Sequence, residues 1–218
     1  INQEPNRTLR NEETGQTDTA PVLEWLLDDN TGTSGTIVKD SSPNRNNGTF
    51  SGSAVWIPGK FGSAVDFRAS STARIHRTSL TGFPAMNQPI SFSYWYRVST
   101  NPSTVQVVSN AIDGGSNGIQ CGFRSSTIMC WKGGGTSLVS TTPPAAGQWV
   151  NVIYTFDGTT HVLYVNGLKA DNSTVSPNSA SISTYELAYN SGWAGEEFAG
   201  DVDQVRDYAY TLSPAQAA

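Results

Sequence analysis

Hydrophobic and polar residues alternate with a period of two between Ile90 and Val98. Over residues 90–98, Phe92, Tyr94 and Tyr96 share one side of an extended strand, while serines and Trp95 share the other. Side chains point to opposite faces at successive positions of a strand. The pattern therefore predicts a strand with one face in a core and one more polar face.

Turn dipeptides separate the hydrophobic runs of residues 149–167. Asp157-Gly158 lies between two runs rich in β-forming residues, and Asn166-Gly167 precedes the next run. Both dipeptides tolerate the positive φ values of tight hairpin turns, so we expect consecutive antiparallel strands here. We find no stretch with helical periodicity. Short strands at close spacing predict an all-β sandwich or barrel.

The chain divides by composition into two parts. Residues 1–20 are polar and contain no aromatic side chain, so we expect a linker or tail there. Residues 21–218 are predicted to form one domain, because sandwiches of about 200–250 residues occur as single units. The sequence begins with Ile1 rather than Met. We interpret it as a segment excised from a larger multidomain protein.

Charge and hydropathy exclude two classes of partner. Thirteen basic and eighteen acidic residues give a net charge of −5. Without a basic cluster there is no electrostatic surface for nucleic acid or for an anionic membrane. No apolar run approaches the roughly 18 residues of a membrane-spanning helix. We therefore expect neither nucleic-acid binding nor membrane insertion.

The two cysteines flank a predicted hairpin turn. Folding the chain about residues 124–126 places Cys121 and Cys130 side by side on neighbouring strands. We expect a disulfide, and hence an extracellular or cell-surface location, because disulfides persist in oxidising compartments. Two buried free thiols are the alternative. A zinc site is not expected, since no second pair of cysteines or histidines accompanies them.

Five segments of the chain resemble motifs of laminin-G-like (concanavalin A-like) jelly-roll domains. They are residues 40–48, 56–67, 90–98, 149–167 and 198–213. Pro43 stands where the motif usually has glycine. The resemblance covers roughly residues 21–214 and implies a two-sheet antiparallel β-sandwich. Domains of this family mostly bind ligands, and a minority are enzymes.

The resemblance also assigns roles to most of the tryptophans. Trp25, Trp56, Trp95 and Trp149 fall on scaffold positions of the family pattern. Aromatic side chains normally supply much of the core area of a sandwich. We therefore expect these four to be structural and not to contact a ligand.

Acidic residues concentrate where the predicted strands turn, and the resemblance implies a structural calcium ion in this region. The expected ligands are Asp28, Asp40, Asn47 and Asp203, with backbone carbonyls from the loop at residues 41–48. Calcium takes about six to eight oxygen ligands of these kinds. The alternative is that these residues cap turns, which Asp and Asn also favour.

Catalysis is not expected. Glycoside hydrolases of this fold carry their carboxylates on one strand as E-x-D-x-x-E, and this motif is absent. Glu196 and Glu197 have the wrong spacing to Asp201 for that arrangement. His76 and His161 are the only histidines, and neither lies in a catalytic motif.

We therefore predict a non-catalytic carbohydrate-binding module with a glycan or polysaccharide as ligand. Trp131 and Trp193 lie outside the scaffold pattern and next to polar, glycine-rich segments, and Asp113 and Asn117 could add polar groups beside the cysteine hairpin. These four form the predicted ligand site. The alternative is an adhesion domain that binds a cell-surface protein, since exposed aromatic side chains also anchor protein interfaces. A glycan-degrading enzyme is the less favoured third possibility.

Overall fold

The structure is a computed structural model that describes residues 20–30, 34–113, 117–132, 137–175 and 179–218. Within these ranges every regular element is a β-strand, as the sequence predicts. The predicted polar tail at residues 1–20 lies almost wholly outside them. No helix in the described ranges is long and apolar enough to span a membrane.

The first sheet contains eight strands in the order β14-β13-β12-β7-β16-β5-β4, and β1 also pairs with β16. Its strands are β1 (Leu23–Trp25), β4 (Val55–Pro58), β5 (Ser63–Asp66), β7 (Ile90–Arg97), β12 (Val150–Phe156), β13 (Thr160–Val165), β14 (Leu168–Thr174) and β16 (Asp201–Tyr208). The first and last strands of the described chain are therefore neighbours. Their pairing brings the N-terminal loops beside β16.

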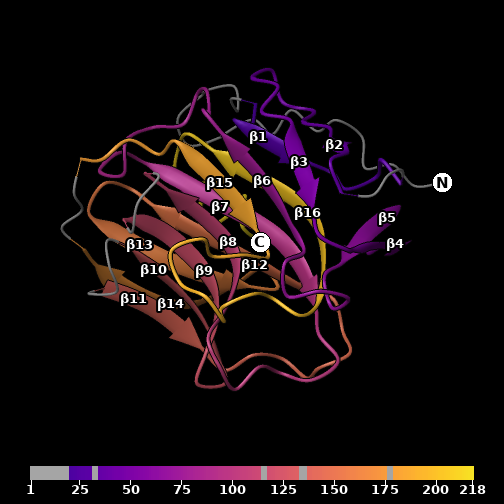
Figure 1. The fold of residues 1–218 in the computed structure, drawn as a ribbon. Coiled ribbons are helices and arrows are strands. Elements are labelled where there is room, and N and C mark those ends of the chain that lie inside the picture. Colours follow the sequence, from indigo (N-terminus) through magenta and orange to yellow (C-terminus); the bar gives the residue numbers. More distant parts are fainter. Residues whose placement is uncertain (1–19, 31–33, 114–116, 133–136, 176–178) are drawn as a thin grey trace.

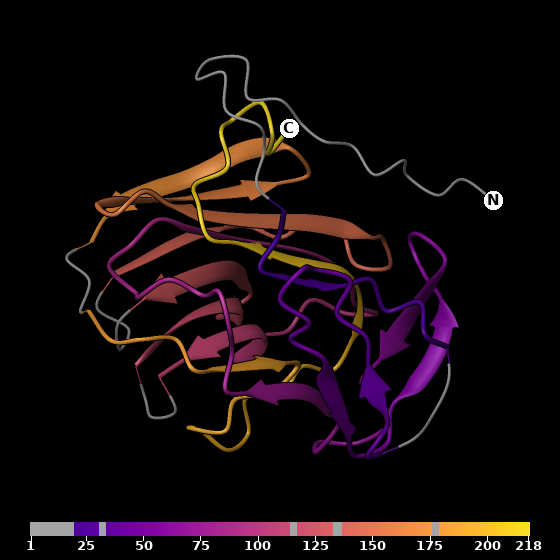
Figure 2. The same cartoon turned by 90° about the horizontal axis from the view of Figure 1, so that it is seen from above.

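The second sheet also contains eight strands, in the order β11-β10-β9-β8-β15-β6-β3-β2. Its strands are β2 (Ile37–Val38), β3 (Gly48–Ser51), β6 (Arg74–Thr78), β8 (Gln106–Ile112), β9 (Gly118–Arg124), β10 (Thr127–Lys132), β11 (Ser137–Thr141) and β15 (Thr184–Leu187). Figures 1 and 2 show the two sheets as stacked layers. The predicted two-sheet antiparallel sandwich is confirmed.

The core lies between the sheets and is largely aromatic. Phe92, Tyr94 and Tyr96 of β7 point into it and are at most 1% exposed. Trp25 is fully buried, and its Nε1 donates to the carbonyl of Asn46. Burying side chains of this size stabilises the fold by roughly 1.5–3 kcal/mol each. The scaffold role expected for Trp25 is confirmed.

The β12–β13 hairpin forms as predicted, but its turn is longer than a two-residue turn. β12 ends at Phe156 and β13 begins at Thr160. Gly158 has a positive φ of 104°. The Oδ1 atom of Asp157 accepts hydrogen bonds from the backbone N–H groups of Thr159 and Thr160. This carboxylate stabilises a three-residue loop.

A disulfide joins Cys121 of β9 to Cys130 of β10. The two residues lie directly opposite each other in the ladder, and both are fully buried. The predicted pairing is confirmed, because the β9–β10 hairpin turns where the sequence pattern placed it.

Two segments cover parts of the outer sheet faces. The chain after β16 runs over the outer face of the first sheet, where Leu212 and Ala217 pack against Ile153 and Tyr164. The loop between β15 and β16 covers part of the outer face of the second sheet (Figure 2). There Ser191 N–H donates to the carboxylate of Glu186.

Candidate ligand-binding site

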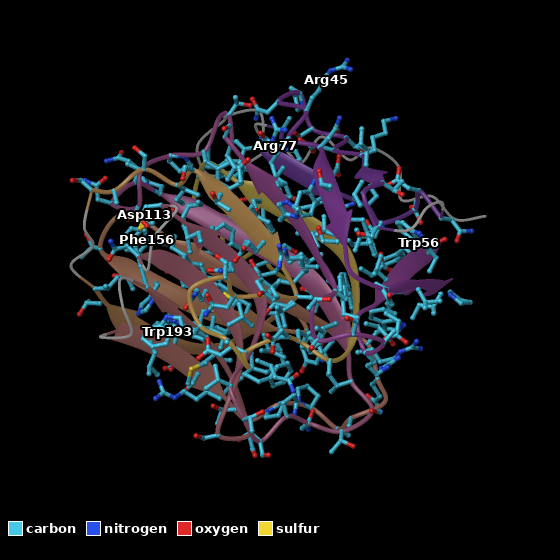
Figure 3. The ribbon with its side chains drawn as sticks, in the orientation of Figure 1. Arg45, Trp56, Arg77, Asp113, Phe156 and Trp193 are labelled. Atoms are coloured by element: carbon cyan, nitrogen blue, oxygen red, sulfur yellow. A yellow bond between two sulfur atoms is a disulfide. The ribbon has the colours of Figure 1, made fainter. Side chains whose placement is uncertain are left out.

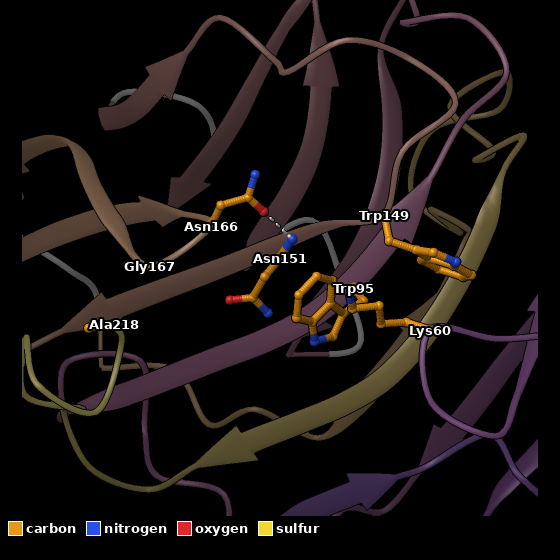
Figure 4. Close-up of a pocket in the computed structure, with 7 residues that line it drawn as sticks. All are labelled: Lys60, Trp95, Trp149, Asn151, Asn166, Gly167 and Ala218. Atoms are coloured by element: carbon orange, nitrogen blue, oxygen red, sulfur yellow. Dashed lines mark hydrogen bonds between the residues drawn. The ribbon is translucent and has the colours of Figure 1, made fainter. Parts of the chain in front are cut away.

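A pocket of about 420 Å³ opens on the outer face of the first sheet (Figure 4). We call it the Trp95 pocket. It is lined by Lys60, Trp95, Trp149, Asn151, Asn166, Gly167 and Ala218. These residues come from the β4–β5 connection, β7, the start of β12, the β13–β14 turn and the C-terminal segment.

The period-two pattern of the strands places Trp95 on this outer face. Its neighbours along β7 that point inward are Tyr94 and Tyr96. Trp95 lies opposite Asn151 of β12 on one side and opposite Asp203 of β16 on the other. An amide, an indole and a carboxylate therefore form a row across three adjacent strands.

An ion-paired arginine holds Trp149 in place. The guanidinium of Arg97 lies 4.8 Å from the ring centroid of Trp149. Arg97 Nε also donates to Asp201 Oδ2 at 2.7 Å, and Asp201 is fully buried. A salt-bridged guanidinium stacked on an indole fixes the orientation of the ring.

The scaffold roles expected for the other three tryptophans have different outcomes. Trp56 is half-buried and packs against the core. Trp95 and Trp149 are also half-buried, but they line the pocket. Their scaffold role stays a prediction, and their place in the pocket lining makes them candidates for ligand contact. The alternation over residues 90–98 already contained the signal, because it placed Trp95 on the polar face.

Two asparagines supply the polar groups of the pocket. The Oδ1 of Asn166 accepts a hydrogen bond from the backbone N–H of Asn151 at 2.9 Å. Asn151 Nδ2 donates to the carbonyl of Tyr94. Asn166 is exposed and has a φ of 50°, which suits its place in the β13–β14 turn. A primary amide both donates and accepts hydrogen bonds, so the pair can engage hydroxyl groups beside two apolar rings.

A second pocket of about 340 Å³ lies near Arg68 and the loop at residues 99–104. Its lining contains no aromatic ring. Ligand pockets are typically lined by aromatic and apolar groups with a few polar anchors. The Trp95 pocket is therefore the better candidate.

The four residues predicted as the ligand site belong to the second sheet and its loops. Asn117 Nδ2 donates to Asp113 Oδ2, so this pair closes the β8–β9 connection. Trp131 lies opposite Gln120 on β10, and Trp193 is 60% exposed in the β15–β16 loop. Figure 3 shows Asp113 and Trp193 well apart. None of the four lines either pocket, and their role in ligand binding stays a prediction.

Two of the four predicted calcium ligands lie against the same short segment, residues 59–63. Asp28 Oδ1 accepts a hydrogen bond from the N–H of Ser63 at 2.7 Å. Asp203 Oδ2 accepts one from the N–H of Phe61 at 2.9 Å. Asp203 is fully buried, and its Oδ1 has no hydrogen-bond partner among the described residues. Burial raises the pKa of Asp203 to about 7.

The other two predicted ligands organise a separate loop. The carboxylate of Asp40 accepts hydrogen bonds from the backbone N–H groups of Glu24, Ser42 and Asn46 and from the hydroxyl of Ser42. Asn47 Oδ1 accepts from the N–H of Asp40. In the described part of the chain, no three acidic, histidine or cysteine side chains converge as a metal-binding group. Asp40 therefore fits the turn-capping alternative.

The two-sheet antiparallel sandwich defines a jelly-roll domain. A family model described as "Concanavalin A-like lectin/glucanases superfamily" (Laminin_G_3) matches residues 67–218. The chain belongs to this family. No curated protein sequence matches it.

Solved structures share this fold at low sequence identity. One is domain 4 of AbnA, an extracellular arabinanase of Geobacillus stearothermophilus, solved in complex with arabinotriose. It has a TM-score of 0.72 and 21% identity, and the match covers 92% of this chain and 98% of that one. The binding domain of Paraclostridial Mosquitocidal Protein 1 has a TM-score of 0.74 and 14% identity over 91% of this chain. The botulinum neurotoxin DC binding domain, determined with rat synaptotagmin II, has a TM-score of 0.71 and 15% identity over 90%. This chain spans about half of each toxin domain.

Proposed function

We propose that this chain is a non-catalytic carbohydrate-binding domain and that the Trp95 pocket binds an oligosaccharide. One observation carries the proposal: two half-exposed indoles, Trp95 and Trp149, lie beside two asparagine side chains on one open sheet face. The apolar C–H face of a pyranose or furanose ring stacks on an aromatic ring. The hydroxyl groups at the edge of the sugar bond to the amides.

Two further points support binding without catalysis. The side chains that line the pocket include no carboxylate, whereas most glycoside hydrolases need a pair of them. The arabinanase domain of the same fold was determined with arabinotriose. Arabinan oligosaccharides are therefore a suitable first ligand series.

Substitution of single tryptophans tests the proposal and locates the site. Trp95→Ala and Trp149→Ala are compared with Trp131→Ala and Trp193→Ala, which make the same change on the other sheet. Binding is measured by a glycan array followed by calorimetry. We expect the first pair to reduce affinity at least tenfold and the second pair to leave it unchanged. Loss confined to the second pair would move the site to the second sheet, and an array without any bound glycan would reject the function.

We also infer that calcium stabilises the domain and that the domain works outside the cell as part of a larger protein. Asp28 and Asp203 supply oxygen ligands of the kind that calcium prefers. The Cys121–Cys130 disulfide suits an oxidising compartment. Chelation should lower the melting temperature, because an ion bound only by the folded state stabilises it. An unchanged melting temperature would contradict the calcium proposal.

Protein binding is the second candidate function. Trp193 and Leu138, which are 60% and 40% exposed, lie on the second sheet and its covering loop. Exposed aromatic side chains commonly anchor protein interfaces. The same Trp193→Ala variant tests this candidate. An adhesion role would be favoured if no glycan binds on the array and if, among the four tryptophan variants, only Trp193→Ala loses binding to a protein partner.

A further inference from the structure

Two cations lie against the two indole rings of the Trp95 pocket. The ammonium of Lys60 is 4.8 Å from the ring centroid of Trp95, and Figure 4 shows Lys60 beside that ring. The guanidinium of Arg97 is 4.8 Å from the ring centroid of Trp149. Arg97 follows Trp95 by two positions on β7, so both side chains point to the same outer face. Each aromatic ring that could stack on a sugar therefore has a positive charge next to it.

The charge of Lys60 is not tied to an acidic partner. Lys60 is exposed, and among the salt bridges of the described residues none includes its ammonium. The ammonium lies near the rings of Phe61 and Trp95. Ring faces attract a cation only weakly at an exposed site. Lys60 is therefore a positive group that can turn toward a ligand in the pocket.

Arg97 is fixed at one edge of its guanidinium and leaves the other edge for a ligand. Its Nε donates to Oδ2 of the fully buried Asp201. The side chain of Arg97 is 34% exposed. A guanidinium carries five N–H donors in a planar fork. The bond to Asp201 uses the Nε–H, and the N–H groups of the two Nη atoms are the ones that suit a carboxylate.

The acidic groups of this face lie deeper than the basic ones. Asp201 Oδ1 also accepts a hydrogen bond from Arg68, which forms a second salt bridge with Asp66. The side chains of Arg68 and Arg97 are 35% and 34% exposed, whereas those of Asp66 and Asp201 are 22% and 0% exposed. These four charges balance, and Lys60 adds one positive charge. A ligand that approaches this face therefore meets the basic groups first.

The basic groups favour a charged sugar over a neutral one. A neutral ring that stacks on Trp95 shares the indole with the Lys60 ammonium and gives that ammonium no new partner. A sugar with a carboxylate gives both Lys60 and Arg97 an anion to bind, and hydrogen bonds between ions are stronger than neutral ones. A planar carboxylate also matches the fork of the guanidinium. This difference in affinity is the physical basis of selectivity.

We propose that the Trp95 pocket selects glycans that contain uronic acids, and that Lys60 and Arg97 bind the carboxylate of the sugar unit stacked on the tryptophans. The inference rests on the proposed carbohydrate function and adds the class of ligand. Charge counts along the chain do not reveal the arrangement, because Lys60 and Arg97 come from separate segments that only the fold brings to one pocket.

Matched pairs of ligands separate charge recognition from carbohydrate binding. Oligogalacturonides are compared with their methyl esters, which keep the sugar ring but lose the charge. Oligosaccharides of glucuronate and of mannuronate are compared with their esters in the same way, and arabinotriose is the neutral reference. Calorimetry of the full chain should show at least tenfold tighter binding of one of the acids than of its ester. The difference should shrink as sodium chloride is added, because salt screens exposed charges.

Substitutions then assign the selectivity to the two basic residues. Lys60→Met removes the charge and keeps an apolar stem of similar length. We expect it to weaken binding of the acid at least fivefold and to leave binding of the ester unchanged. Lys39→Met is the matched control, because Lys39 is exposed and does not line the pocket, and it should bind like the wild type. Arg97→Lys keeps a charge beside Asp201 but loses the fork, and it should also weaken binding of the acid alone.

The outcomes distinguish this inference from the proposed function. If acids and esters bind equally well and Trp95→Ala abolishes both, the pocket binds carbohydrate, but its selectivity for uronic acids is overturned. The selectivity is also overturned if Lys60→Met weakens the ester as much as the acid, because the lysine then acts through its shape and not its charge. If neither acids nor neutral glycans bind, the carbohydrate function and the inference fail together.

Discussion

The backbone N–H of Phe61 donates a hydrogen bond to the carboxylate of Asp203, 142 residues further along the chain. Phe61 belongs to the connection between β4 and β5, and Asp203 belongs to β16. Because β16 pairs with both β5 and β7, this contact places the connection beside Trp95. The pocket is therefore assembled from strands that only the sandwich topology brings together.

Replacing Asn166 by Asp should weaken ligand binding without unfolding the hairpin. Aspartate keeps an oxygen that can accept the hydrogen bond from Asn151, and it tolerates the positive φ at this position. It loses the amide donor and adds a negative charge at the pocket. We expect at least a fivefold loss of affinity by calorimetry, with the melting temperature nearly unchanged. If the wild type and the Asn166→Asp variant bind the oligosaccharide with equal affinity, Asn166 is excluded from the binding site.

Replacing Asp40 by Ala should destabilise the fold to the same degree with and without calcium. The buried Asp40 carboxylate accepts four hydrogen bonds within the chain. Its removal leaves buried donors unpaired, which costs about 1–3 kcal/mol each. Urea denaturation in calcium and in chelator measures the loss. A loss confined to the calcium-containing buffer would make Asp40 a metal ligand after all.

Replacing Lys132 by Met should stabilise the protein at neutral pH. Lys132 is fully buried, its Nζ lies 3.5 Å from the ring centroid of Phe156, and burial lowers its pKa to about 7. The unfolded value is about 10.4. Between these values the unfolded chain binds a proton that the folded chain does not, so the free energy of unfolding rises with pH across this range.

The Met variant should lose that rise between about pH 7 and pH 10, because no ionisable group remains at the position. Urea denaturation at several pH values measures it. Lys169→Met, on the exposed β14, is the control and should keep the wild-type slope. A wild-type slope in the Lys132 variant as well would show that Lys132 is not the group responsible.

Removing the disulfide in a Cys121→Ala/Cys130→Ala variant should lower stability moderately. The two cysteines are nine residues apart, so the bond closes a short loop and restricts few unfolded conformations. A loop of this length contributes less than about 3 kcal/mol. Thermal and urea unfolding measure the difference. Complete loss of folding would mean that the bond is essential for folding.

Several features of the fold followed from local patterns. The period-two alternation of β7 identified its core face, and Cys121 and Cys130 pair because the hairpin between them is local. The β12–β13 turn shows the limit of such patterns. The Asp157 side chain accepts two backbone hydrogen bonds and stabilises a three-residue loop, and a dipeptide alone does not reveal these contacts.

The candidate site was less accessible to sequence reasoning. Trp95 and Trp149 match scaffold positions. The alternation over residues 90–98 placed Trp95 on the polar face, but only the fold brings Trp149 to the same pocket. Asp28 and Asp203 were expected to bind one calcium ion together with Asp40 and Asn47, but the Asp40 carboxylate already accepts four hydrogen bonds from the chain itself. A sequence does not show which acceptors the fold will satisfy internally.

By itself, the sequence determined the all-β class, the core face of the strand at residues 90–98 and the pairing of Cys121 with Cys130, because alternation and turn chemistry act between neighbours in the chain. Tertiary structure decided which distant side chains meet. The sheet and its connections place residues 60, 95 and 149 around one pocket and residue 203 opposite residue 95, regardless of their separation along the chain. A binding surface depends on those long-range neighbours, and so it emerged only with the sheet.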